Sequence, residues 1–267
     1  MSLPPVGAFR QAQGPGEPPA PPLRVTVWNE YRHERDEPHV AAIYPDGIHG
    51  AIAAGLHALL PDASITTATL DQPDNGLPPA RLDETDVLLW WGHRAHDVVD
   101  EAVAERVASH VLSGMGLVAL HSAHFSRPFI RLMGTTCSLR WRNDGEREVV
   151  WTVAPGHPLT AGVPDPLVLD RHETYGEYFD IPQPDELIFL SNFAGGEVFR
   201  SGVTFRRGRG RIFYFSPGDQ NYPIYHDERI HRILANAAEW ARPTAPRVLP
   251  TVTHDARGWF DGVPPAA

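Results

Sequence analysis

The chain has 267 residues, of which 42% are hydrophobic, which is enough for one large domain with a buried core. Its formal net charge of −10 argues against a nucleic-acid partner, because an acidic surface repels phosphates. No stretch approaches the roughly 18 apolar residues that a membrane helix needs, and no apolar signal core lies near the N-terminus, so we expect a cytoplasmic protein that does not enter a membrane.

The composition of reactive side chains excludes several enzyme classes. All 23 basic residues are arginine, so Schiff-base chemistry, lysine-anchored pyridoxal phosphate and a P-loop are excluded. The single cysteine, Cys137, allows no internal disulfide, and we interpret it as a small, half-buried structural side chain. Histidine, with 14 residues, is the abundant proton carrier and metal ligand at neutral pH.

The first half of the chain predicts an α/β domain. Residues 1–22 hold seven prolines and almost no apolar periodicity, which indicates a disordered tail before a domain over residues 23–242. Strands are expected at 24–29, 63–70, 85–91 and 116–121, and helices at 44–61 and 97–114. Long crossovers between strands predict a mainly parallel sheet with helices on both faces.

The second half of the chain is richer in strands. Strands are expected at 147–153 and 186–191, a hairpin over 197–216 that turns at "RRGRG", and a closing helix at 227–241. A proline-rich extension follows over 243–267. It either packs on the domain or on a second copy in a homo-oligomer, or it is a loose tail, and both alternatives stay open.

Seven histidines fall at one predicted edge of this sheet. Ligands of open parallel sheets bind beyond the carboxyl ends of the strands. The segments that follow the strands, together with the start of the first helix, carry His33, His49, His93, His96, His121, His124 and His226. Any one of them alone is more often a loop residue or a hydrogen-bonded support, but their shared location favours one pocket.

The stretch "GMGLVALHSAHFS" (114–126) resembles the strand-to-helix turn that exposes a catalytic nucleophile, with His121 at its tip. A serine hydrolase using Ser122, with Asp219 as the orienting acid, is the competing hypothesis. The pattern G-x-S-x-G is absent, and side chains of neighbouring residues diverge at such a turn. The stretch therefore favours His121 as a ligand or proton carrier.

Imidazoles together with carboxylates suit Zn²⁺ or a similar divalent ion. We predict a metal site at this edge, although the spacing "HRAH" (93–96) does not match the zincin motif. The predicted metal ligands are His33, His49, His96 and His226, and the predicted catalytic residues are His121, Glu173 and Asp219. Glu30, Asp97 and Glu173 are available to orient the imidazoles.

The segment "RHETYGEYFD" (171–180) combines carboxylates with aromatic rings, a composition that suits sugar recognition but also fits a solvated loop. Together with polar and aromatic residues of the edge, it predicts a sugar-binding surface. The predicted substrate-binding residues are Glu30, Arg32, Trp91, His124, Tyr175 and Tyr222.

Several long strings resemble the ThuA family of trehalose-utilisation proteins over roughly residues 24–241. They include "VWNEYRHE", "TDVLLWWGHRAHDVV", "GMGLVALHSAHFS", "CSLRWR", "YGEYFDIPQPDEL" and "YPIYH". The resemblance implies a fold similar to the class I glutamine amidotransferase domain, a flavodoxin-like three-layer α/β sandwich. His121 takes the place of the amidotransferase cysteine, and Ser216 and Gly218 stand where its His-x-Glu would fall, so amidotransferase chemistry should be absent.

The resemblance also implies bacterial disaccharide metabolism alongside an NAD-dependent sugar oxidoreductase. We therefore expect a protein that acts on a keto-sugar or keto-glycoside with help from a divalent metal, as an isomerase, lyase or hydrolase, with Glu173 or His121 as general base. A non-catalytic sugar-binding or accessory subunit of the oxidoreductase is the alternative. Two departures from the family pattern are Asp219, where many relatives carry histidine, and Ala123, where glycine is frequent.

Overall fold

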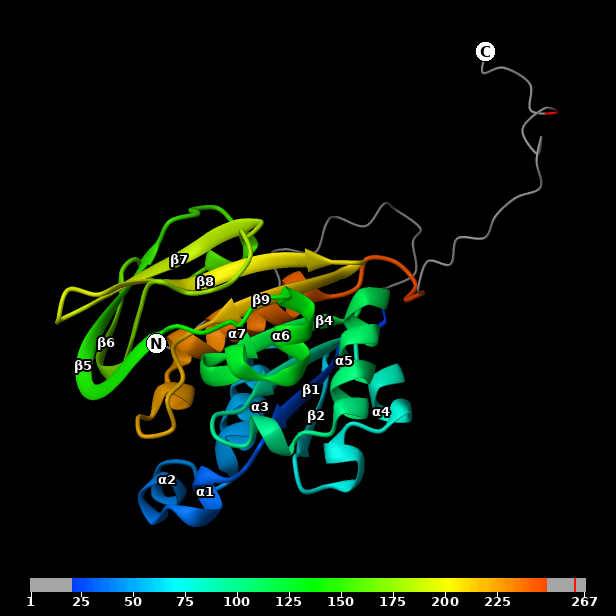
Figure 1. Ribbon diagram of the computed structural model, residues 1–267, viewed down its shortest axis with the longest axis horizontal. Helices are drawn as coiled ribbons and strands as arrows, with labels where there is room; N and C mark the ends of the chain where they lie inside the picture. The colour runs from blue at the N-terminus through cyan, green and yellow to red at the C-terminus, as the bar shows by residue number, and fades with distance from the viewer. Residues whose placement is uncertain (1–20, 249–261, 263–267) are drawn as a thin grey trace.

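The computed structural model describes residues 21–248 and residue 262, and the strands in this part of the chain form one sheet (Figure 1). The strands are β1 (Arg24–Asn29), β2 (Ser64–Thr69), β3 (Val87–Trp91), β4 (Gly116–Leu120), β5 (Arg140–Thr152), β6 (Leu167–Gly176), β7 (Glu186–Phe193), β8 (Val198–Arg207) and β9 (Gly210–Phe215). Their order in the sheet is β2-β1-β3-β4-β9-β8-β7-β5-β6.

Seven α-helices and five short 3₁₀ helices accompany the sheet in the described part of the chain. The α-helices are α1 (His33–Asp36), α2 (Pro38–Ile43), α3 (Gly47–Leu59), α4 (Pro79–Asp83), α5 (Glu101–Ser113), α6 (Arg127–Met133) and α7 (Glu228–Ala241). The 3₁₀ helices are η1 (Pro73–Gly76), η2 (His96–Val98), η3 (His121–Phe125), η4 (Pro158–Thr160) and η5 (Ile224–His226).

The sheet is mixed. Within the described residues, the four pairings from β2 to β9 are parallel, and the four from β9 to β6 are antiparallel. The α/β class is confirmed, whereas the prediction of a mainly parallel sheet is not, because the chain adds its later strands as hairpins instead of through helical crossovers. A flavodoxin-like architecture stays a prediction.

Helices cover both faces of the parallel half of the sheet. Ile52 of α3 and Ile233 of α7 belong to the buried cluster on one face, and Val107 of α5 and Phe129 of α6 belong to the cluster on the other. All five residues of β3 are buried, as its almost wholly apolar sequence indicates for a strand covered on both faces. In Figure 1 the antiparallel strands β5 to β8 extend beyond these helices to one side.

Most predicted elements are present, and the main difference concerns residues 140–176. The sequence predicts a strand only from residue 147 and no strand over 171–180, but β5 begins at Arg140 and pairs with β6, which ends at Gly176. His172, Glu173 and Tyr175 of β6 are buried. A strand with polar residues on a buried face lacks the apolar alternation that a sequence pattern detects.

The predicted tails, 1–22 and 243–267, lie almost wholly outside the described residues. In the part that is described, the Arg247 guanidinium donates to the backbone carbonyls of Leu82 and Thr85, so the chain just after α7 is tied to the segment that precedes β3. None of the helices described is long and apolar enough to cross a membrane.

Candidate functional site

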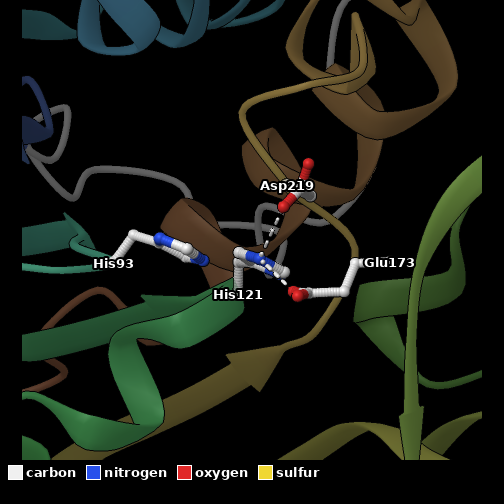
Figure 2. A group of neighbouring side chains, drawn as sticks. All are labelled: His93, His121, Glu173 and Asp219. Atoms are coloured by element: carbon white, nitrogen blue, oxygen red, sulfur yellow. Dashed lines mark ion pairs between the residues drawn. The ribbon is translucent and has the colours of Figure 1, made fainter. Parts of the chain in front are cut away.

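Four side chains from distant parts of the chain meet beside the carboxyl ends of the parallel strands. They are His93 after β3, His121 after β4, Asp219 after β9 and Glu173 of β6, and each offers a ligand atom within 4.8 Å of the others. Figure 2 shows His121 between the other three side chains. We call these four residues the His/carboxylate cluster. It unites the three residues predicted as catalytic with His93, a histidine of the predicted edge.

The turn after β4 presents His121 as the sequence leads us to expect. His121 has a φ of 53°, a left-handed backbone that a strained strand-to-helix turn requires, and η3 begins at this residue. Its Nδ1 donates to the backbone carbonyl of Ser216 at 2.9 Å. Its Nε2 lies 3.0 Å from Glu173 Oε2 and 3.8 Å from Asp219 Oδ2 (Figure 2).

The His/carboxylate cluster carries more negative than positive charge. Burial by itself lowers the pKa of His121, but the carboxylates of Asp219 and Glu173 outweigh burial and raise that pKa to about 10. Burial, followed by the charge of His121, lowers the pKa of His93 to about 3. Burial raises the pKa of Asp219, yet its contact with His121 reverses this and holds that pKa well below its usual range. Two buried carboxylates thus face one imidazolium.

The loop that carries Asp219 is anchored by a buried histidine. His172 Nε2 accepts from the backbone N–H groups of Gly218 and Asp219 at 2.9 and 3.2 Å. Its Nδ1 lies 2.7 Å from Glu148 Oε2, and Ser191 Oγ donates to the other oxygen of Glu148. Because Nε2 accepts, the proton of His172 is on Nδ1 and faces Glu148. This series of hydrogen bonds therefore holds the backbone at Gly218 and Asp219 in place.

Glu30, which was predicted to bind substrate, instead holds the loop after β3. Its carboxylate accepts from the backbone N–H groups of His93, Arg94 and Ala95 at 2.8 to 3.2 Å, and the residue is only 1% exposed. His33, which was predicted as a metal ligand, places its Nε2 2.9 Å from His93 Nδ1. Both residues therefore contact His93, Glu30 at its backbone N–H and His33 at Nδ1 of its ring.

The other histidines predicted as metal ligands lie outside the His/carboxylate cluster. His49 Nδ1 is 3.0 Å from Asn29 Nδ2, the ring of His96 packs edge-on against Phe125, and His226 donates from Nε2 to the carbonyl of Ile43. In the part of the chain that the structure describes, the group that could hold an ion is formed without any of them and without His33.

The remaining residues predicted to bind substrate occupy three kinds of position. Arg32 forms a bidentate ion pair with Asp71 at the surface. Trp91 and His124 are buried and bond to backbone carbonyls, those of Gly218 and Cys137 respectively. Tyr175 and Tyr222 approach the cluster.

Tyr175 stacks on the ring of His121, and its hydroxyl lies 3.4 Å from His121 Nε2. The Tyr222 hydroxyl donates to Asn143 Oδ1, and Asn143 Nδ2 donates to Asp219 Oδ2 at 3.2 Å. Asn143 was missed by sequence reasoning because it lies in the part of β5 that was not predicted as a strand. No motif marks it.

The two nucleophiles considered from the sequence have other environments. Ser122 Oγ is hydrogen-bonded to the Tyr175 hydroxyl at 2.7 Å rather than to an imidazole. Cys137 is buried in the aromatic core, and burial raises the pKa of its thiol to about 11, so the thiol is protonated at neutral pH. Neither residue has the adjacent base that activates a nucleophile.

Comparisons with known proteins find a matching family and solved structures of similar fold. The family model of ThuA, described as trehalose utilisation, matches residues 24–241. No curated protein matches the chain. Among solved structures, a ThuA-like protein from Bacteroides uniformis aligns with a TM-score of 0.61 and 16% identity, covering 88% of this chain and 98% of that one.

Two further structures share the fold. A ThuA-like protein from Parabacteroides merdae aligns with a TM-score of 0.57 and 14% identity, covering 84% of this chain and 92% of that one. A cytoplasmic protein from Salmonella typhimurium aligns with a TM-score of 0.51 and 12% identity, covering 83% of this chain and 100% of that one. At these identities the similarity establishes the fold alone.

Proposed function

Because the chain belongs to the ThuA family, whose description is trehalose utilisation, we propose that it acts on a keto-sugar or keto-glycoside at the His/carboxylate cluster. The observation that carries this proposal is the convergence of His121, Glu173 and Asp219 from three separate elements into one buried group. Burying several ionisable groups together costs the fold free energy, and perturbed pKa values concentrate at functional sites.

A divalent cation fits the donor set of this cluster. Two imidazoles and two carboxylates are nitrogen and oxygen ligands without a thiolate, a set that suits Zn²⁺ or a similar ion. The charge balance supports the same conclusion, because a divalent cation neutralises two carboxylates when both imidazoles are neutral. When bound, the ion would polarise a carbonyl or hydroxyl oxygen of the sugar.

The protein's own residues supply proton transfer. Glu173 Oε2 lies 3.0 Å from His121 Nε2, and both residues are almost completely buried, so this carboxylate lies beside the cation ligands and away from bulk water. In this proposal Glu173 removes a proton from a sugar carbon next to a carbonyl group. It then gives the proton to the neighbouring carbon in an isomerisation, or to the departing glycosidic oxygen when the C–O bond breaks in an elimination. Isomerisation of a keto-sugar, or elimination that opens a glycosidic bond, needs this step.

The proposal is tested on purified protein with a keto-glucoside followed by NMR, together with metal analysis by mass spectrometry. We expect conversion of the substrate by the wild type, a loss of at least 100-fold in kcat for Glu173→Gln, and no change for His57→Gln on the exposed face of α3. Equal turnover by Glu173→Gln and wild type would refute the assignment of the base.

The proposal also includes a partner enzyme and a cellular compartment. An oxidoreductase of the NAD-dependent class would supply the keto-sugar, and both proteins would work in the cytoplasm of a bacterium. Pull-down of such a dehydrogenase together with unchanged sugar turnover in His121→Ala would instead favour an accessory subunit.

A further inference from the structure

A short chain of hydrogen-bonded side chains links the His/carboxylate cluster to the protein surface. His93 Nδ1 lies 2.9 Å from His33 Nε2, and His33 Nδ1 lies 2.6 Å from Glu37 Oε1. His33 is 5% exposed, whereas Glu37 is partly exposed and also accepts from Arg94 at 3.2 Å. Neither His33 nor Glu37 is close enough to join the cluster itself.

The hydrogen bonds between these side chains indicate which ring nitrogens of His33 and His93 carry protons. Glu37 can only accept, so His33 Nδ1 carries a proton and donates it. An imidazole ring that carries a single proton, here on Nδ1, accepts at its other nitrogen, so Nε2 of His33 is the acceptor that faces His93 Nδ1. His93 must then donate from Nδ1, and its unprotonated Nε2 remains for the cluster.

The main chain and the ring of His93 are held by different residues. Glu30 fixes the backbone through the N–H groups of residues 93–95, whatever the orientation of the imidazole. The rings of Trp91 and His121 lie nearly parallel to the His93 ring, with centroids 6.3 and 5.6 Å away, which restrains the plane of His93 but not its protonation. His33 is therefore the side chain that selects between the two tautomers of His93.

We propose that His33, oriented by Glu37, is a positioning residue that holds His93 in the Nδ1-protonated tautomer, so that Nε2 serves as a ligand for a divalent cation at the His/carboxylate cluster. This inference rests on the proposed metal site, and its structural half, the tautomer of His93, can be measured without any metal. Removing such a supporting partner typically weakens metal affinity by about 10- to 100-fold.

The first experiment is calorimetric titration of Zn²⁺ into full-length, chelator-treated protein. We expect His33→Leu, which removes the acceptor, to raise the Kd for Zn²⁺ about 10- to 100-fold. In His33→Gln the amide oxygen stands near the position of Nε2, and the Kd should return to within a few-fold of the wild type. His57→Leu removes an exposed imidazole of α3 and should leave the Kd unchanged.

The second experiment records long-range ¹H–¹⁵N spectra of the metal-free protein, with the His93 signals assigned by their loss in His93→Gln. We expect Nδ1-protonated His93 in the wild type and a mixture of tautomers in His33→Leu. A proton on His93 Nε2 in the wild type, or an unchanged Kd in His33→Leu, would overturn the proposal. If the wild type binds no Zn²⁺, both the metal half of this inference and the metal assistance of the proposed function fail, and the spectra still decide the role of His33.

Discussion

Replacing His121 by asparagine should destabilise the metal-free protein strongly at neutral pH and weakly at high pH. Asparagine tolerates the left-handed backbone at this position, so the substitution tests the charge rather than the turn. It leaves the carboxylates of Glu173 and Asp219, which are at most 4% exposed, without the imidazolium between them. A buried charge that loses its partner costs about 3–5 kcal/mol.

The pH dependence of this effect follows from the pKa of His121, which is raised from 6.5 to about 10 in the folded state. A raised histidine pKa stabilises the fold fully below the unfolded value, and the stabilisation is lost as the pH rises through the folded value. The contribution of His121 to the free energy of unfolding is therefore about 4 kcal/mol at pH 7 and about 1 kcal/mol at pH 9. Because His121 also lies in the proposed metal site, the relation applies to chelator-treated protein.

Urea denaturation of wild type and His121→Asn at pH 7 and pH 9, in the presence of a chelator, measures this difference. The titrating groups outside the His/carboxylate cluster are common to both proteins and largely cancel in the comparison. The pKa of Asp219 rises when His121 is removed, so the measured difference includes this change. His57→Asn, on an exposed face of α3, should change the free energy of unfolding little at either pH. A loss in His121→Asn that is below about 1 kcal/mol, or equal at pH 7 and pH 9, would refute the charge assignment.

Three further predictions concern other parts of the molecule. Burial raises the pKa of Asp86, but its bonds to Arg24 outweigh burial and lower that pKa below the ordinary value, so Asp86→Asn should cost about 1 kcal/mol in urea denaturation at neutral pH. This loss should shrink as the pH falls from neutral through the lowered pKa, and a loss that does not change with pH would contradict the assignment. A Cβ at Gly218 would lie 2.0 Å from the Tyr225 hydroxyl, so Gly218→Ala should lower the free energy of unfolding by about 1–3 kcal/mol and lower the Tm. An unchanged Tm would show that the loop moves enough to accommodate the methyl group. Zn²⁺ at 100 times its Kd should raise the free energy of unfolding of wild type by about 2.7 kcal/mol in differential scanning fluorimetry, and no shift would argue against the metal site.

The sequence predicts the parallel half of the fold well because its signals there are local. The apolar runs of β3 and β4, and the helical spacing in α3 and α5, each lie within a few turns or strand residues. Even the turn after β4 follows from its local string, and the φ of His121 agrees with it. The antiparallel half was predicted less well, because β6 buries polar side chains and its sequence therefore resembles that of a loop.

The site was predicted in part for the same reason. His121 and Asp219 follow strands that the sequence identifies, so the rule of carboxyl ends brings them together. The sequence could not show that His93, and not His96, joins the His/carboxylate cluster, because this depends on how Glu30 holds the backbone between them. Asn143 joins the site only because the long strand β5 passes beside the loop of Asp219.

The sequence by itself therefore determined the α/β class, the positions of most elements and the concentration of histidines beyond the strand ends. Periodicity and turn residues depend on neighbours along the chain, and these patterns are readable without a structure. Only the tertiary structure decided that Glu173 of β6 lies 3.0 Å from His121 and that His33 lies behind His93 and outside the cluster. Such contacts join residues about 50 to 60 positions apart, and their distances depend on the packing of the whole sheet.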